Sequence, residues 1–152
     1  MRLSFRLKHF FFSAFREFFV HHHGSLEFRA KIFALVIGAN EKAKVENFII
    51  VKDIALNIYN GDEDRANLLM MSTRELVQKI RDDNGLGMDL LLESIQKELK
   101  VVPRYAKKID IKALKPLLSL THDEDTLAYQ ESILEFLQKL KDETLSKTKK
   151  EK

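Results

Sequence analysis

The sequence of 152 residues contains no cysteine and no tryptophan, and only two prolines and five glycines. The lack of cysteine excludes a disulfide framework, cysteine-ligated zinc, iron–sulfur clusters and a thiol nucleophile. With so few prolines and glycines, long stretches lack helix breakers, which favours helices over a β fold with many turns. The length fits one domain. A composition of 45% hydrophobic and 32% charged residues is typical of a globular protein.

Positive charge is concentrated at the two ends of the chain, whose formal net charge is +3. Residues 1–20 contain four cations against one anion, and residues 144–152 repeat that balance, so the body between them is slightly acidic. This distribution differs from the uniformly basic surface of a nucleic-acid-binding protein. Nucleic acid is therefore disfavoured as a partner.

The N-terminal segment is rich in phenylalanine, since seven of the 11 phenylalanines lie in residues 1–20. At helical spacing they form a wide apolar face opposite the arginines. The interrupting charges argue against a membrane-spanning helix or a secretory signal. We expect a docking helix that packs on its own domain, on a second copy or on a protein partner, or that lies in a membrane interface beside anionic lipid. The candidate docking residues are Phe5, Phe11, Phe12, Phe15, Phe18, Phe19, Arg2, Arg6 and Arg16.

Apolar periodicity in the rest of the chain predicts an all-α fold, a compact bundle of six or seven helices without strands. The predicted helices cover residues 26–38, 45–59, 62–80, 88–100, a stretch that begins after Asp110, and 125–142. Asp82 to Gly87 matches a turn between helices better than an EF-hand loop, because Leu86 stands at a ligand position.

The last predicted helix, at 125–142, follows the sequence Thr121-His122-Asp123-Glu124, which has the spacing of a capping box. The residues expected to be buried on this helix are Tyr129, Ile133, Phe136, Leu137 and Leu140. The predicted organisation is a Phe-rich basic helix and histidine linker at 1–24, a helical domain at 25–143, and a mobile lysine-rich tail at 144–152.

Two stretches, residues 32–59 and 114–140, share an order of apolar helix, polar joint and second apolar helix. The joints begin at Asn40 and Asp123. This pattern resembles the tellurite-resistance TerB-like family, an all-helical fold in which two such units pair, and the resemblance covers about residues 28–142. In this sequence Asn40 stands where the family has an aspartate, and Glu41 and Glu124 stand where it has glycines.

The resemblance implies that acids of the joints bind a divalent metal, Ca²⁺ or Mg²⁺, through oxygen ligands. The implied ligands are Glu41, Glu46, Asp123 and Asp125. The alternative is that Asp123, Glu124 and Asp125 are an N-cap and first-turn acids that complement a helix dipole. No other cofactor is predicted.

The sequence contains no P-loop, nucleophile elbow, HExxH or dinucleotide-binding glycine pattern. We therefore expect a non-enzymatic interaction or scaffold module, stress- or envelope-associated, that docks through its N-terminal helix. The expected location is the cytoplasm, including the inner face of a membrane. The alternatives are a peripheral membrane protein that binds through residues 1–20, and a metal sensor or metal-dependent enzyme that uses the acidic joints.

Overall fold

A computed structural model describes residues 24–82 and 86–150, and all regular structure in these ranges is helical. This confirms the all-α bundle predicted from the sequence. None of the helices in these ranges has the length and apolar character needed to span a membrane. The elements are α2 (Gly24–Gly38), α3 (Val45–Ile58), α4 (Glu63–Asp82), α5 (Leu86–Val101), η1 (Pro103–Lys108), α6 (Ile111–Leu114), η2 (Lys115–Leu120) and α7 (Glu124–Lys150).

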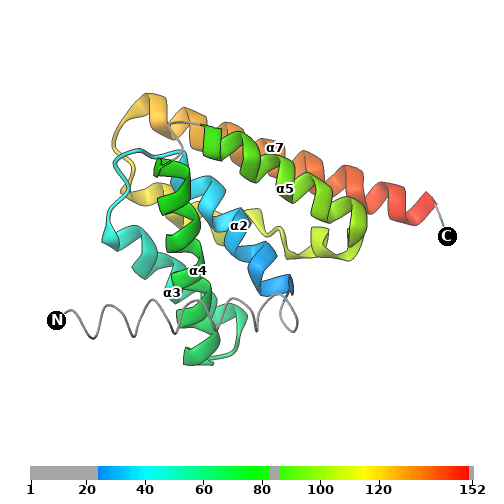
Figure 1. Cartoon of the computed structure of the whole chain (residues 1–152), viewed down its shortest axis with the longest axis horizontal. Helices are drawn as coiled ribbons and strands as arrows, with labels where there is room; N and C mark the ends of the chain where they lie inside the picture. The colour runs from blue at the N-terminus through cyan, green and yellow to red at the C-terminus, as the bar shows by residue number, and fades with distance from the viewer. Residues whose placement is uncertain (1–23, 83–85, 151–152) are drawn as a thin grey trace.

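Helix α2 forms the centre of the bundle. It crosses the middle of Figure 1, with α3 and α4 on one side and α5 and α7 on the other. It contacts α4, α5, α7 and η1. Nine of its 15 residues are buried, and they lie on every face of the helix, as expected for a helix surrounded by others. At its polar edge, Lys31 Nζ lies 2.7 Å from Glu98 Oε2 and links α2 to α5.

Helices α3, α4 and α5 are amphipathic, as the apolar periodicity of the sequence predicts. Val51, Ile54 and Ala55 of α3 are buried against the neighbouring helices. Leu69 and Val77 belong to the buried stripe of α4. Because each of these helices also has an exposed face, a single apolar face is sufficient for its burial.

The breaks between the helices follow from local turn chemistry. Asn60 (φ 53°) and Gly61 (φ 85°) adopt left-handed conformations directly after α3, where a helix C-terminus commonly requires them. Asp62 Oδ1 accepts a hydrogen bond from the backbone N–H of Arg65 and caps α4. Pro103 and Pro116 each lie in the first turn of a 3-10 helix, where the missing N–H has no cost.

Helix α7 differs from the prediction in phase. Tyr129 and Phe136, predicted to be buried, are 47% and 37% exposed. The buried stripe consists of Gln130, Ile133, Leu134 and Leu137, so the predicted burial of Ile133 and Leu137 is confirmed and that of Tyr129 and Phe136 is wrong. The helix is rotated from the predicted phase because the amide of Gln130 has hydrogen-bond partners inside the bundle, as described below.

Helix α7 also differs from the prediction in length, because it continues to Lys150 instead of ending near residue 142. Residues 144–150 of the predicted tail are therefore helical. Leu145 packs against the core. The hydroxyls of Thr144 and Thr148 donate to the carbonyls of Leu140 and Thr144, one turn earlier in the same helix. The apolar contact of Leu145 extends the amphipathic pattern beyond the predicted end.

Candidate functional site

The two polar joints singled out by the sequence repeat lie next to each other. Asn40, between α2 and α3, donates through Nδ2 to Thr121 Oγ1 at 3.5 Å, and Thr121 precedes α7. The joints border a groove of about 340 Å³, which we call the joint groove. Its lining residues are Asn40, Lys42, Lys44, Glu46, Asn47, Leu120, Thr121, His122 and Asp123.

A buried glutamine connects the joints to the centre of the bundle. The Thr121 hydroxyl donates to Gln130 Oε1 at 2.7 Å, and Gln130 Nε2 donates to the carbonyl of Val36 at 3.0 Å. Gln130 is fully buried, and both ends of its amide are hydrogen-bonded. Sequence reasoning missed this residue, although its position one turn before Ile133 and Leu134 marks a polar residue on an apolar stripe. The network holds α7 against α2.

Asp123 is the N-cap of α7. Its Oδ2 accepts hydrogen bonds from the backbone N–H and the hydroxyl of Thr126, at 3.0 and 2.7 Å. These bonds, with a smaller contribution from the nearby Lys42, lower the pKa of Asp123 below its ordinary value of 3.8. The predicted capping box is wrong, because the hydroxyl of Thr121 bonds to Gln130 while Asp123 caps the helix.

The structure brings two of the four predicted metal ligands to one place. Glu46 and Asp123 line the joint groove, whereas Glu41 and Asp125 are exposed and do not line it. Lys42 and Lys44 line the same groove. Within residues 24–82 and 86–150 there is no group of three histidine, aspartate or glutamate side chains that could hold a metal ion.

Side-chain oxygen atoms of two residues that line the joint groove already accept hydrogen bonds from the protein backbone. Asn40 Oδ1 accepts from the backbone N–H of Lys42, and Asp123 caps α7. Since Ca²⁺ requires six to eight oxygen ligands, two carboxylates beside two lysines fit such an ion poorly. Metal binding stays a prediction from the resemblance. Calorimetric titration with Ca²⁺ and Mg²⁺ tests it, because heat that disappears in Asp123→Ala would support a site at the joints.

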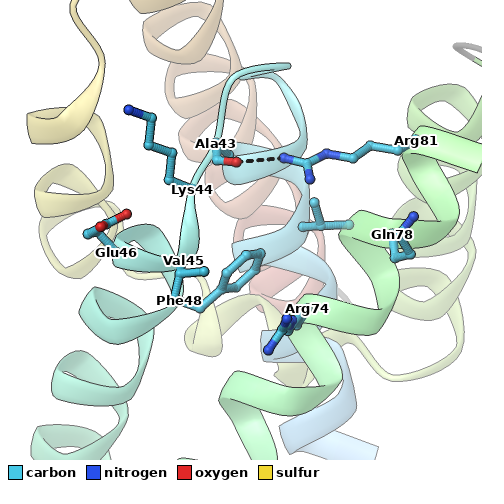
Figure 2. A pocket seen from close by; sticks show the side chains of 9 residues that line it. Ala43, Lys44, Val45, Glu46, Phe48, Arg74, Gln78 and Arg81 are labelled. Carbon is cyan, nitrogen blue, oxygen red and sulfur yellow. Dashed lines mark hydrogen bonds between the residues drawn. The ribbon is translucent and has the colours of Figure 1, made fainter.

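A second groove lies on the other side of Lys44, between the start of α3 and the second half of α4. We call it the α3–α4 groove, and its volume is about 370 Å³ (Figure 2). Its lining residues are Ala43, Lys44, Val45, Glu46, Phe48, Arg74, Val77, Gln78 and Arg81. Three of these side chains are cationic and one is anionic, so the groove is electropositive.

The cations of the α3–α4 groove differ in how they are held. Arg81 Nη2 donates to the carbonyl of Ala43 at 2.9 Å, which places its guanidinium at the edge of the groove (Figure 2). A guanidinium has five N–H donors, so others stay available. The side chains of Lys44 and Arg74 form no ion pair or hydrogen bond within the part of the chain that the structure describes.

The start of α3 is unusual because its N-cap residue is Lys44, which provides no side-chain cap. Helix N-termini favour Ser, Thr, Asp or Asn at this position, and the helix dipole disfavours a cation there. Asn47, in the same first turn, is 2% exposed and lines the joint groove, and its Nδ2 has no hydrogen-bond partner. The first turn of α3 therefore has no side-chain cap and contains an unpartnered amide donor, and its acidic residue is Glu46.

The docking residues predicted between Arg2 and Phe19, like the histidine linker, lie outside the described residues. No protein family, curated protein or solved structure matches the chain. The resemblance to the TerB-like family therefore stays a prediction from the sequence.

Proposed function

We propose that this protein is a non-enzymatic helical interaction module. The observation that supports the proposal is the apolar surface beside the α3–α4 groove. Val45 and Ile49 are 61% and 53% exposed and lie one helical turn apart on α3. Val45 lines the α3–α4 groove together with the cations Lys44 and Arg74, for which the described residues provide no ion-pair partner. Apolar residues exposed beside arginine are typical of protein-binding surfaces.

Site-specific photo-crosslinking tests this function. A photoreactive benzoylphenylalanine replaces Ile49 in one variant and Lys139, an exposed residue of α7, in the control. In the cells that produce the protein, the Ile49 variant should form a discrete adduct with another protein and the Lys139 variant should not. Equal adducts at both positions, or no adduct at Ile49, would contradict an interaction function for this surface.

A second docking element is proposed for residues 1–20, because this segment contains seven phenylalanines and three arginines. This composition suits either a protein partner or a membrane interface. Co-sedimentation with vesicles that contain phosphatidylserine separates the two. The full chain is compared with a variant in which Phe11, Phe15 and Phe18 are replaced by serine. Binding that the serines abolish would favour the membrane, and absence of binding by the full chain would favour a protein partner.

A further inference from the structure

We propose that the α3–α4 groove binds an acidic peptide segment of a partner protein, with carboxylates on Arg74 and Arg81 and an apolar side chain over Phe48. This inference rests on the proposed function and specifies the partner's chemistry. It follows from the charge of the groove, its apolar floor and the end of α3 that opens into it.

The charge of the groove selects an anionic partner. Lys44, Arg74 and Arg81 oppose Glu46 alone among its lining residues. In Figure 2 Arg74 and Arg81 lie on the α4 side of the opening between α3 and α4, whereas the side chain of Lys44, at the start of α3, extends away from α4. Arginine binds carboxylates with two parallel hydrogen bonds, and such charge-assisted bonds are stronger than neutral ones. Arg81 is already oriented by its bond to the Ala43 carbonyl, which lowers the entropy cost of binding at this side.

The floor of the groove selects a peptide with an apolar side chain. Phe48 and Val77 are core residues that also line the groove, and Val45 extends the apolar surface to the rim. A volume of about 370 Å³ is at the small end of the range for ligand pockets, roughly 300–1,000 Å³. The groove therefore has room for a few side chains of a peptide and not for a folded domain.

The N-terminus of α3 contributes donors to the same site. Ala43, Lys44 and Val45 line the groove where the helix begins, and no side chain caps the first turn. First-turn N–H groups and the helix dipole attract anions. An acidic side chain of the bound peptide would supply the acceptor that Lys44 cannot. On the joint-groove side of the same turn, Asn47 Nδ2 is a buried donor without a hydrogen-bond partner.

The chain's own termini do not complement this groove. Residues 1–20 contain Arg2, Arg6, Lys8 and Arg16 against Glu17, and residues 144–152 are rich in lysine. Both ends repel an electropositive site. Nucleic acid is also a poor fit, because the cations surround a compact apolar floor and do not form an extended basic surface. The acidic run Asp62-Glu63-Asp64 of a second copy is the remaining competitor, and the experiment includes it.

Selection from a random 12-residue peptide library on the immobilised full chain tests the proposal. We expect enriched sequences to combine aspartate or glutamate with a large apolar residue. Anisotropy of a fluorescent enriched peptide should show a dissociation constant at least tenfold weaker for Arg74→Gln than for the unmodified protein. Lys79→Gln removes an α4 charge outside the groove and should leave the affinity unchanged.

Four results would overturn the proposal. Enriched peptides without acidic residues, or acidic peptides that bind Arg74→Gln as tightly as the unmodified protein, would contradict the groove while leaving an interaction function intact. A library that yields no enriched peptide would contradict peptide binding, and the Ile49 crosslink would then decide the interaction function separately. A dimer in sedimentation equilibrium that Arg74→Gln dissociates would assign the groove to a second copy.

Discussion

Gln130 shows how one polar residue can determine the packing of a helix. A buried amide is stable only when its donor and acceptor are both hydrogen-bonded. Thr121 and the Val36 carbonyl meet this requirement, so Gln130 takes the inward position and Tyr129 faces solvent. A sequence pattern based on hydrophobicity alone favours the tyrosine, because the partners of the glutamine lie up to 94 residues away in the sequence.

Replacing Gln130 by leucine tests the role of this network. Leucine is similar in size but removes the acceptor for the Thr121 hydroxyl proton and the side-chain donor to the Val36 carbonyl. We expect a loss of about 2–3 kcal/mol in the free energy of unfolding, since each unpaired buried polar group costs roughly 1–3 kcal/mol. Urea denaturation measures it. Gln138→Leu, an exposed position on the same helix, should change stability by less than about 0.5 kcal/mol, and equal effects at both positions would contradict the network.

Asp123 should make the stability of the protein depend on pH in the acid range. The hydrogen bonds from Thr126 lower the pKa of Asp123 in the folded state below its ordinary value of 3.8. The ionised carboxylate therefore stabilises the fold fully at pH values above this ordinary pKa. The contribution is lost as the pH falls through the lowered pKa, because the protonated form no longer accepts both bonds equally well.

The measurement compares unmodified protein with Asp123→Ala by denaturation between pH 7 and pH 2. The difference in unfolding free energy should be constant near neutral pH and should shrink as the carboxylate protonates. Asp125→Ala serves as the control, because Asp125 has no capping bond to lose. A difference between Asp123→Ala and the unmodified protein that grows towards low pH would contradict the assignment of Asp123 as a cap stabilised by its charge.

At the scale of helices, the sequence predicted α2 to α5 well because their burial repeats with helical period and their ends coincide with turn residues. Leu69 and Val77 are in phase on α4, and α3 ends at Ile58, next to the predicted end at residue 59. The end of α7 was not predicted, since Leu145 continues the stripe into a segment whose composition is that of a solvated tail.

The α3–α4 groove could not be predicted from the sequence, although part of its signal is present. Arg74, Gln78 and Arg81 are spaced to share one face of α4. Polar residues on one face usually indicate solvent exposure, so this spacing has no specific meaning by itself. The other wall comes from the start of α3, about 30 residues earlier, and only the packing of α3 on α4 brings Lys44 opposite Arg74.

Replacing Lys44 by serine should raise the stability of the protein and weaken its binding of an acidic peptide. Lys44→Ser supplies a side-chain cap and removes a cation from the positive end of the dipole, so unfolding free energy should rise by about 1 kcal/mol. The same change removes one cation from the α3–α4 groove, so an acidic peptide should bind more weakly. Chemical denaturation and peptide anisotropy measure the two effects.

Lys52→Ser, at an interior position of α3, is the matched control for this substitution. Serine there supplies no cap and should lower stability by a few tenths of a kcal/mol because of its weaker helix propensity. Its effect on peptide affinity should be small, since Lys52 does not line the groove. A Lys44→Ser protein that is less stable, or that binds the peptide as tightly as before, would contradict the interpretation of Lys44 as a binding residue at an uncapped helix end.

At the scale of the whole molecule, the net charge of +3 describes no single surface. The sequence places basic residues at both ends and a mildly acidic body between them, and within that body the fold gathers Lys44, Arg74 and Arg81 from two helices. The two proposed docking elements are an aromatic segment of the sequence, residues 1–20, and the electropositive α3–α4 groove. They differ in chemistry, so they can bind different partners.

The most direct test of the account is NMR mapping of the isotopically labelled full chain with a selected acidic peptide. Binding in the α3–α4 groove predicts amide shifts concentrated at residues 43–49 and 74–81, with little change in α5 or α7. Shifts concentrated elsewhere, for example around Lys100 and Lys147 between α5 and α7, would contradict the claim that this groove is the binding surface of the protein.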